Sequence, residues 1–401
     1  MSTVYVTGAG TVSAIGRDLS ENIQSLKNGL SGLGKVRHFE TSLDVPVGEV
    51  PQDNASLQKT LVPKRAVRMS RTSLLGIQAS VEAVCDCLNR GARLSDKRIG
   101  LISGTSVGGM DLSEQFWREN RKDLTKGDLS LLSEHDCGAS TQDIAEALLD
   151  SKLVGSFSFI TTISTACSSA GNALMLAFRM IRSGMLDCAV VGGTDSLCRF
   201  TLNGFNSLMI LSGNACRPFD ETRDGLNLGE GAGYLVLSSE EAENSYCGMT
   251  GAACADEAFH QTGSSPDGIG PYMAMEQALR SSGLKPGDIS FINTHGTGTP
   301  ANDLSESIAI KRLFGEKVPA FGSVKAFIGH TLGASEGIEA AYCAYALSNG
   351  ALLPSLNFKS PISQTGLVPC GKYSEGNDVR NILSNSFGFG GNCSSLVFSK
   401  I

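Results

Sequence analysis

The chain has 401 residues and a formal net charge of −7, with 41% hydrophobic and 18% charged residues. This length is enough for one large core or two fused ones, and the composition is typical of a globular protein. An acidic balance argues against general nucleic-acid binding, which requires a basic surface.

Short apolar runs ending in glycine alternate with helical patterns along the chain. In the first half the runs lie at 4–10, 99–109, 187–193 and 232–238, and the helical patterns at 72–89, 139–152 and 168–183. The second half contains helical patterns at 271–282, 304–314 and 335–348, a strand at 289–296 and a strand–glycine loop–strand unit at 381–399. These patterns predict an α/β fold with a mixed or parallel sheet covered on both faces. We expect two halves, 1–247 and 248–401, that pack as one unit.

The first strand contains VTGAGTVSAIG (6–16), which is similar to a dinucleotide-binding fingerprint. Ser13 replaces its third glycine, and no acidic residue ends a second strand at the expected distance. We therefore predict a tight structural turn here and no nucleotide site.

The twelve cysteines are scattered and include no C-x-x-C pair. This excludes the usual zinc frameworks and is typical of reduced thiols in the cytoplasm. The first residues lack the charged flank and apolar run of a signal peptide, and no stretch is long and apolar enough for a membrane span. A cytoplasmic protein without membrane segments is expected.

Cys167 is placed unusually, among hydroxyl side chains at the start of the helical pattern 168–183. A thiol in the first turn of a helix faces unpaired backbone N–H groups and the positive end of the helix dipole. Both features lower a thiol pKa and offer donors for an oxyanion. Simple packing of a small buried side chain is an equally good explanation of this position.

Two of the five histidines strengthen the catalytic interpretation. His295 follows a predicted strand in NTHGTGTP, a loop too rich in glycine and threonine for a packed core, and His330 lies in KAFIGHTLGASEG just before a helix. Lys325 precedes His330 by five residues. Together with a cysteine at a helix start, these histidines favour a composed active site over a metal site, because no close carboxylate or cysteine shares ligand spacing with them.

Five motifs in order carry a family resemblance over essentially the whole chain: TACSSAGNAL, RPFDETRDGLNLGEGAG, NTHGTGTPANDLSE, VKAFIGHTLGASEG and NSFGFGG. They resemble the signatures of the β-ketoacyl-[acyl carrier protein] synthases, the elongating condensing enzymes of fatty-acid and polyketide synthesis. The resemblance implies a thiolase-like fold, in which two similar α/β halves form a five-layered αβαβα sandwich. It also implies a homodimer, although a heterodimer with a partner subunit is an alternative.

The resemblance assigns Cys167 as the nucleophile that accepts an acyl chain, and His295 and His330 as the paired histidines of the malonyl site. Lys325 matches the lysine that supports this site, and Glu306 an acid in its polar network. Decarboxylation of malonyl thioester would form an enolate that attacks the acyl-Cys167 thioester. Imidazole N–H donors stabilise such an enolate without a metal, so no cofactor is expected.

Further positions match the family's substrate contacts. Thr297 and Thr299 correspond to residues along the phosphopantetheine arm, Phe389 to the gating phenylalanine beside the oxyanion hole, and Val107 to a residue that lines the acyl pocket. The basic cluster at 63–71 reads as a solvated helix face on general grounds, but Lys64 and Arg68 match positions that meet the acidic acyl carrier protein. The expected partners are this carrier protein and small acyl and malonyl thioesters.

Three positions depart from the family pattern. Cys393 replaces an asparagine, Leu226 replaces a common phenylalanine, and Glu257 stands where aspartate is usual. The cysteine at position 393 puts in doubt the hydrogen-bond network of its loop and any cation linked to Glu339.

Four functions are compatible with these features. The leading one is a condensing enzyme of fatty-acid synthesis, and a ketosynthase of a polyketide or aryl polyene pathway is close to it. A thiolase would use a second cysteine such as Cys393, but its reaction does not call for His330 and Lys325. A non-catalytic chain-length subunit would lack the nucleophile that Cys167 provides.

Overall fold

Ten strands form one mixed sheet in the computed structural model, which describes residues 3–65, 68–121, 123 and 127–401. The five strands of the first half are β1 (Val4–Ser13), β4 (Ile99–Gly104), β5 (Phe159–Ile163), β6 (Cys188–Asp195) and β7 (Gly231–Ser238). Those of the second half are β8 (Cys247–Asp256), β9 (Phe291–Asn293), β10 (Ala320–Gly322), β11 (Asn381–Phe387) and β12 (Asn392–Ser399). A separate small ribbon pairs β2 (Leu33–Gly34) with β3 (Val47–Gly48).

The helices alternate with these strands. The first half contains α1 (Leu19–Asn28), α2 (Asn54–Leu61), α3 (Arg71–Asn89), α4 (Met110–Asn120), α5 (Cys137–Asp150), α6 (Ser169–Arg182) and α7 (Arg199–Ser207). The second half contains α8 (Ile269–Ser282), α9 (Pro300–Phe314), α10 (Lys325–Ile328) and α11 (Ser335–Asn349). No helix among the described residues is long and apolar enough to cross a membrane.

The two halves repeat one topology. The order β1-α3-β4-α5-β5-α6-β6-β7 recurs as β8-α8-β9-α9-β10-α11-β11-β12. The strand orders match as well, β5-β4-β6-β7-β1 in one half and β10-β9-β11-β12-β8 in the other. Along each of these orders, the first two strand pairings are parallel and the last two pairings are antiparallel. The halves join edge to edge where Val4–Val6 of β1 pairs with residues 247–249 of β8.

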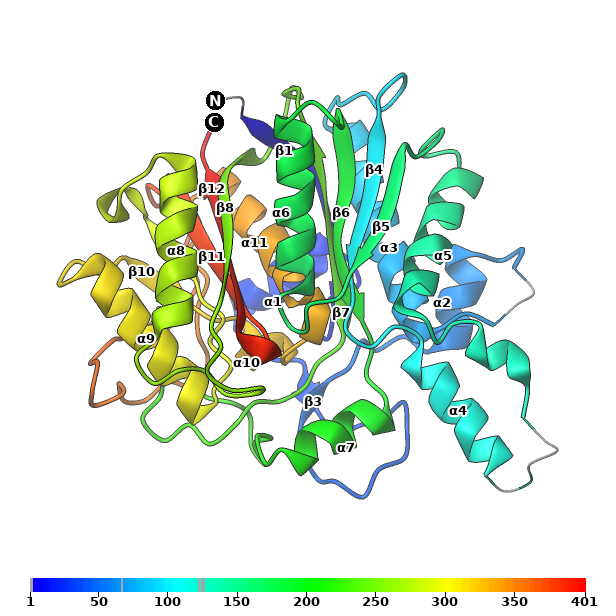
Figure 1. The fold of residues 1–401 in the computed structure, drawn as a ribbon, viewed down its shortest axis with the longest axis horizontal. Coiled ribbons are helices and arrows are strands. Elements are labelled where there is room, and N and C mark those ends of the chain that lie inside the picture. Colours follow the sequence, from blue (N-terminus) through cyan, green and yellow to red (C-terminus); the bar gives the residue numbers. More distant parts are fainter. Residues whose placement is uncertain (1–2, 66–67, 122, 124–126) are drawn as a thin grey trace.

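The layers follow from this repeat. Helices α3 and α5 cover the outer face of the first half, and α8 and α9 cover that of the second (Figure 1). Helices α6 and α11 lie between the halves and contact strands of both. This arrangement is the five-layered αβαβα sandwich expected from the sequence, and most residues of the two central helices are buried.

Glycines allow the central and outer helices to approach the sheet closely. A Cβ added to Gly8 or Gly10 of β1 would lie 2.3 Å from a backbone oxygen of α3, and one added to Gly233 of β7 would lie 2.2 Å from a backbone nitrogen of α11. The glycines of 6–16 therefore serve helix packing. The predicted tight turn is confirmed at the end of this stretch, after β1, where the Ser13 N–H donates to the Gly16 carbonyl at 2.9 Å and the Gly16 N–H donates to the Ser13 carbonyl at 3.3 Å.

The other predicted elements are present, with shifted ends. The strand expected at 289–296 is limited to β9, and the helix expected from residue 304 already begins at Pro300. Thr299 caps that helix by accepting from the Asn302 N–H, and proline is suited to the first helical position because it needs no N–H partner. The boundary between the halves at residue 247 stays a prediction.

We predict that Gly233→Ala lowers the free energy of unfolding by about 1–3 kcal/mol, because the new methyl group has no space between β7 and α11. Gly155→Ala is a matched control, since no other atom lies within 4 Å of its added Cβ. Urea unfolding of both variants measures the difference. Equal stability of the two variants would contradict the close packing described for α11.

Candidate active site

Cys167 lies in a strained turn between β5 and α6. Ala166 has a left-handed φ of +52°, which is rare for a residue with a side chain and costs about 1–3 kcal/mol. The Ala166 carbonyl accepts hydrogen bonds from the hydroxyls of Ser106 (2.8 Å) and Ser169 (2.6 Å). Ser386 on β11 donates to the Cys167 carbonyl at 3.0 Å. Contacts from both halves of the chain therefore hold the cysteine backbone.

The surroundings of the thiol differ from the sequence-based expectation. Helix α6 begins at Ser169, so Cys167 precedes its first turn. Cys167 is buried, and burial raises the pKa of the thiol to about 11 although hydrogen bonding from the Phe389 backbone and the charge of Lys325 lower it. The predicted lowering of the Cys167 pKa is therefore wrong, because loss of hydration outweighs the favourable dipoles. The resting cysteine is a neutral thiol at pH 7.

His295 and His330 come together face to edge. Their ring centroids lie 5.2 Å apart with an interplanar angle of 86°. Each side chain is only 2% exposed, so the loop of His295 is a packed part of the core, contrary to the expectation for a loop rich in glycine and threonine. Burial and the nearby Lys325 lower both histidine pKa values well below the usual range. Both rings are therefore neutral at pH 7.

The hydrogen bonds of His330 define its tautomer. Its Nδ1 atom lies 3.3 Å from the Leu332 backbone N–H, which can only donate, and 3.0 Å from the Ser335 hydroxyl. Nδ1 is therefore an acceptor, and the proton of the neutral ring is on Nε2. Nδ1 of His295 is buried and has no partner among the described residues. Each histidine thus keeps one ring nitrogen for a ligand.

Lys325 forms a buried ion pair behind the histidines. Its Nζ atom lies 2.7 Å from Oε1 of Glu339, and both side chains are 1% exposed. The Asn293 amide donates to the other Glu339 oxygen at 3.3 Å. Burial and the neighbouring Glu339 raise the pKa of Glu336 well above its usual value, so Glu336 is neutral at pH 7. Burial also raises the pKa of Glu339, and the ion pair with Lys325 opposes that shift.

The cation linked to Glu339 in the family does not fit these contacts. Lys325 already supplies the positive charge that a cation would bring, and both Glu339 oxygens accept from nitrogen donors. Within the described part of the chain, no cluster of three or more histidines, cysteines or acids is arranged to hold a metal. No step below depends on a metal ion.

Glu306 shapes the loop that carries His295. Its two carboxylate oxygens accept from the backbone N–H groups of His295 and Gly296, each at 2.9 Å. Asn385 on β11 donates to the same carboxylate at 3.1 Å. Burial raises the pKa of Glu306 to about 7. Glu306 is therefore a positioning residue for His295, as its predicted place in a polar network implies.

The glycine loop after β11 closes over the thiol. A Cβ on Gly388 would lie 2.9 Å from the Thr165 carbonyl oxygen and 3.2 Å from the Cys167 nitrogen, so a side chain here would force the backbone apart. The Phe389 ring stacks on Phe205 of α7, with centroids 5.6 Å apart. Asn392 accepts from the Ser168 hydroxyl (2.8 Å) and the Asn172 amide (2.7 Å), which ties the end of the loop to α6.

These groups border one cavity of about 300 Å³. It is lined by Cys167, both histidines, Thr297, Thr299 and the loop from Phe387 to Gly391. The hydroxyls of Thr297 and Thr299 lie 3.0 Å apart on one wall. The structure thus brings together the predicted nucleophile, histidine pair, threonines and gate.

Val107 lies outside this lining. It is half-buried against an apolar cluster that includes Leu226, Phe205 and Ile210, and those three residues border the cavity themselves. The cluster extends the cavity wall with apolar side chains. It is therefore the part of the site suited to an acyl chain.

Asp195 at the end of β6 is a site residue that the sequence analysis missed. It is fully buried and accepts from the N–H groups of Ser106, Val107 and Gly333, at 2.9, 3.1 and 2.6 Å. It thereby fixes the loop after β4 against the segment that follows His330. The available signal was an acid that ends a buried apolar strand, where a charge requires several partners.

The three departures from the family pattern have structural explanations. Glu257 accepts from the N–H groups of Ser265 (2.9 Å) and Gly270 (3.0 Å), so it holds the segment before α8. Leu226 packs in the apolar cluster beside Val107. Cys393 is buried opposite Phe387 on the neighbouring strand, and burial raises the pKa of its thiol far above the usual value. Cys393 also lines the cavity of Cys167.

The basic cluster at 63–71 divides into buried and exposed members. Arg71 forms a buried ion pair with Glu230 at 2.6 Å, and Arg65 pairs with Asp143 on α5. Lys64 and Arg68 are exposed, so their side chains are accessible to a partner. Their contact with a carrier protein stays a prediction.

Both halves of the chain match models of one protein family. Residues 1–243 match the model described as "Beta-ketoacyl synthase, N-terminal domain", and residues 246–359 match the C-terminal domain of the same family. The chain is 33% identical to 3-oxoacyl-[acyl-carrier-protein] synthase 2 of Staphylococcus aureus strain COL, covering 99% of this chain and 98% of the relative. It is 35% identical to the protein of that name from Synechocystis sp., with the same coverage.

Solved structures agree with these sequence matches. The ishigamide ketosynthase/chain length factor aligns with a TM-score of 0.91 and 30% identity, over 100% of this chain and 99% of that one. A ketosynthase in complex with its chain length factor from Xenorhabdus doucetiae aligns with a TM-score of 0.84 and 28% identity, over 100% and 98%. A type II PKS acyl-carrier protein complex with its ketosynthase, AntDE:AntF, aligns with a TM-score of 0.86 and 25% identity, over the full length of both chains.

The raised pKa of Cys167 predicts a specific pH dependence of alkylation. A thiol with a pKa of about 11 gains thiolate as pH rises, so its rate of reaction with iodoacetamide should keep increasing up to pH 10. Mass spectrometry of the peptide containing Cys167 measures this rate. An alkylation rate that stops increasing below pH 8 would contradict the raised pKa of the Cys167 thiol.

Proposed function

The chain belongs to the β-ketoacyl synthase family, whose members are acyl-transferring condensing enzymes, and on this premise we propose that it is a 3-oxoacyl-[acyl carrier protein] synthase. It would join a malonyl thioester to an acyl chain held on Cys167. The observation that carries the proposal is the shared cavity, in which a buried thiol lies with two neutral histidines and a loop of backbone donors.

The first step is transfer of the acyl chain to the cysteine. The Cys167 sulfur attacks the thioester carbonyl, and the backbone N–H groups of Cys167 and Phe389 hold the resulting oxyanion, each worth about 3 kcal/mol. The phosphopantetheine thiol leaves and takes up the proton that Cys167 loses. Because the Cys167 pKa is raised, proton removal accompanies the attack. The apolar cluster beside Leu226 receives the chain.

The second step breaks the carbon–carbon bond to the malonyl carboxylate. Carbon dioxide leaves, and the electron pair moves to the thioester oxygen to form an enolate. Nε2–H of His330 donates to this oxygen, and His295 offers the second donor. The enolate carbon then attacks the acyl carbonyl on Cys167, and the cysteine sulfur leaves. Neutral histidines suit this role because they donate without surrendering a full proton.

The reaction as proposed uses no cofactor, since the thioesters themselves provide the activated carbonyls. The acyl carrier protein is the proposed partner that delivers the thioesters, and the AntDE:AntF structure contains such a carrier with its ketosynthase.

All twelve cysteines are free thiols, which supports the cytoplasmic location expected from the sequence.

A second candidate is a ketosynthase of a specialised pathway that works with a partner subunit. The ketosynthase/chain length factor alignments favour it. The family match disfavours a thiolase, although Cys393 lines the same cavity as Cys167. The presence of Cys167 argues against a non-catalytic chain-length subunit.

We also propose a dimer formed through the edge of the sheet. β5 is the terminal strand of the sheet order and pairs only with β4, which leaves one row of backbone groups free. Ile160 on this strand is 41% exposed. Such an edge favours pairing with a second copy about a two-fold axis, or with a homologous partner subunit.

The condensing function predicts that Cys167→Ala abolishes acylation. Purified protein incubated with acyl-loaded carrier protein should gain the mass of the acyl group on Cys167, and the variant should gain none. Carbon dioxide release from malonyl-loaded carrier protein should accompany condensation. Equal labelling of the variant would refute the assignment, and a Cys393→Ala control should keep labelling.

The proposed dimer predicts that Ile160→Lys yields a monomer, because a buried charge at the strand edge opposes pairing. Light scattering measures the mass. Met185→Lys is the control, since Met185 is 61% exposed in the turn after α6. A wild-type chain that is monomeric at micromolar concentration, alone and with a candidate partner subunit, would contradict the interface.

A further inference from the structure

A second buried acid, Glu336, lies beside the Lys325–Glu339 pair and takes no part in the steps above. It is the second residue of α11, three positions before Glu339, and its side chain is fully buried. Neither of its carboxyl oxygens has a hydrogen-bond partner among the described residues. An ionised carboxylate in such a place carries a large free-energy cost, so the structure favours the protonated acid at this position.

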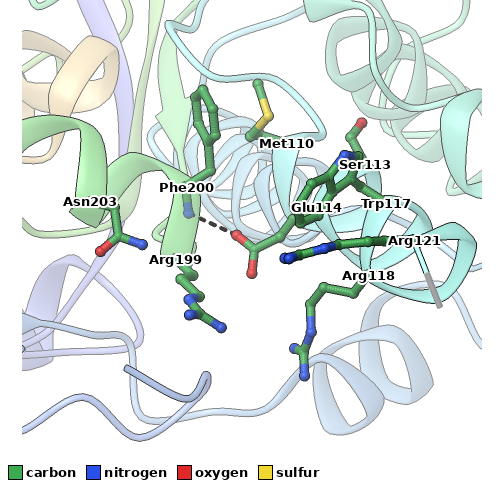
Figure 2. A pocket seen from close by; sticks show the side chains of 9 residues that line it. All are labelled: Met110, Ser113, Glu114, Trp117, Arg118, Arg121, Arg199, Phe200 and Asn203. Carbon is green, nitrogen blue, oxygen red and sulfur yellow. Dashed lines mark hydrogen bonds between the residues drawn. The ribbon is translucent and has the colours of Figure 1, made fainter. Parts of the chain in front are cut away.

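Glu114 shows how an acid near the surface of this chain is paired instead. It lines a cavity of about 860 Å³ between α4 and α7 and accepts from the Phe200 N–H at 2.8 Å. Figure 2 shows its carboxylate among the three arginine side chains that line the same cavity. Donors and positive charges of this kind stabilise an ionised carboxylate. Glu336 has no such set of donors.

Glu336 fills space between the two central helices. A Cβ added to Gly171 of α6 would lie 3.3 Å from Cγ of Glu336 and 2.4 Å from the Ser394 hydroxyl oxygen of β12. Neither Gly171 nor Ser394 carries a charge. Gly171 lies four residues after Cys167, which is about one helical turn. Glu336 is therefore packed against the helix that follows the nucleophile.

Four titratable groups interact with Glu336. Glu339 and Cys343 belong to the same helix, Lys325 to α10 and Glu306 to α9. Burial and then Glu339 are the main causes of the raised Glu336 pKa, Glu306 adds to them, and Lys325 opposes them. Among these four groups Lys325 is the only cation, so the cluster contains more acids than positive charges.

One proton shared by Glu336 and Glu339 would make this cluster neutral. Glu339 accepts from Lys325 at 2.7 Å and from Asn293 at 3.3 Å, yet burial still raises its pKa. Residues three positions apart on a helix have Cβ atoms about 5–6 Å apart, so the two carboxyl groups are within reach of each other. A protonated Glu336 is then a further donor to Glu339 and stabilises its ionised form.

The charge state of this cluster affects the catalytic residues through Lys325. The Lys325 ammonium lowers the pKa values of Cys167, His295 and His330. Lys325 keeps this charge in a buried position only while an ionised partner is beside it. A donor that keeps Glu339 ionised therefore also keeps the Lys325 charge next to the thiol and the two rings.

We propose that Glu336 is a positioning residue of the condensing reaction, which shares one proton with Glu339 and keeps Glu339 ionised as the partner of Lys325. Glu336 does not line the cavity of Cys167, so it acts through these two residues and touches none of the reacting atoms. The inference rests on the proposed function, because it concerns the charge that controls the thiol and the histidines during condensation.

Infrared spectroscopy measures the shared proton directly, because a protonated carboxyl group and a carboxylate absorb at different frequencies. The difference spectrum of wild type minus Glu336→Gln should contain a protonated-carboxyl band at pH 7. Wild type minus Glu339→Gln should contain the same band, because Glu336 then becomes the ionised partner of Lys325. A band that is lost in neither variant, or only in Glu336→Gln, would overturn the sharing of the proton. This measurement does not depend on activity.

Two substitutions separate the shared proton from packing. Glu336→Leu keeps much of the volume but has no donor, so Glu339 should take up a proton and Lys325 should lose its charged partner. We expect the rate of Cys167 alkylation at pH 7, and kcat/KM for malonyl-loaded carrier protein, each to fall by about tenfold. Glu336→Gln keeps an N–H donor for Glu339 and should stay within about threefold of the wild type in both measurements.

Glu82→Gln is the matched control. Burial raises the pKa of Glu82 on α3 to about 7, and its carboxylate accepts from the N–H groups of Thr11 and Leu19 at 2.8 and 2.7 Å. It does not line the cavity of Cys167, so the substitution should leave both rates unchanged.

Several results would overturn the role of Glu336. Wild-type rates in Glu336→Leu with a native thermal transition would do so, and so would a rate of Glu336→Gln as low as that of the leucine variant. If Glu336→Leu does not fold, Glu336→Gln and the infrared bands still decide. A wild-type rate that requires potassium ions would assign the compensating charge to a cation and overturn the shared proton. Absence of condensation by the wild type would contradict the proposed function itself, and the infrared bands would still test the proton.

Discussion

The buried ion pair of Lys325 and Glu339 is the interaction on which the chemistry of the site depends. Its ammonium group lies close enough to lower the pKa values of Cys167, His295 and His330 together. For the histidines, the Lys325 charge and burial both lower the pKa, so the rings stay neutral. For the cysteine, the Lys325 charge lowers the pKa whereas burial raises it. Breaking a buried pair leaves one uncompensated charge, which typically costs about 3–5 kcal/mol. The ion pair therefore affects the pKa values of the cavity residues and also the stability of the central helix α11, which carries Glu339.

The repeated halves explain how the remaining groups converge. Cys167 follows β5, the third sheet strand of the first half, and Lys325 and His330 follow β10, the equivalent strand of the second half. The two segments lead into α6 and α11, the central helices, so equivalent positions of the two halves meet at one point. Buried carboxylates then fix the loops around that point. Glu306 holds the loop of His295, and Asp195 joins the loop after β4 to the segment after His330.

The sequence was sufficient for the order of elements, the layered architecture and the choice of Cys167, His295 and His330 as residues of one site. These depend on periodicity and on short motifs, which are local. The pKa of Cys167 was predicted with the wrong sign because burial is set by the whole fold, and one turn of sequence does not contain it. The packing role of Gly8 and Gly10 was missed for the same reason, since they contact α3, some seventy residues later. Asp195 was missed because its partners come from two segments far from it in the sequence, residues 105–107 and Gly333.

The division of the site between the halves also affects how the enzyme can lose activity. Cys167 belongs to a segment that is held by Ser106 from its own half and by Ser386 from the other. A small rotation of one half about the β1–β8 seam would separate the thiol from the histidines, because they belong to different halves. One buried cluster, with residues of α6, α11 and strands of both halves, opposes such a rotation. The contacts that form the central core are therefore also the contacts that keep the thiol beside the histidines, so a substitution in this cluster lowers stability and activity together.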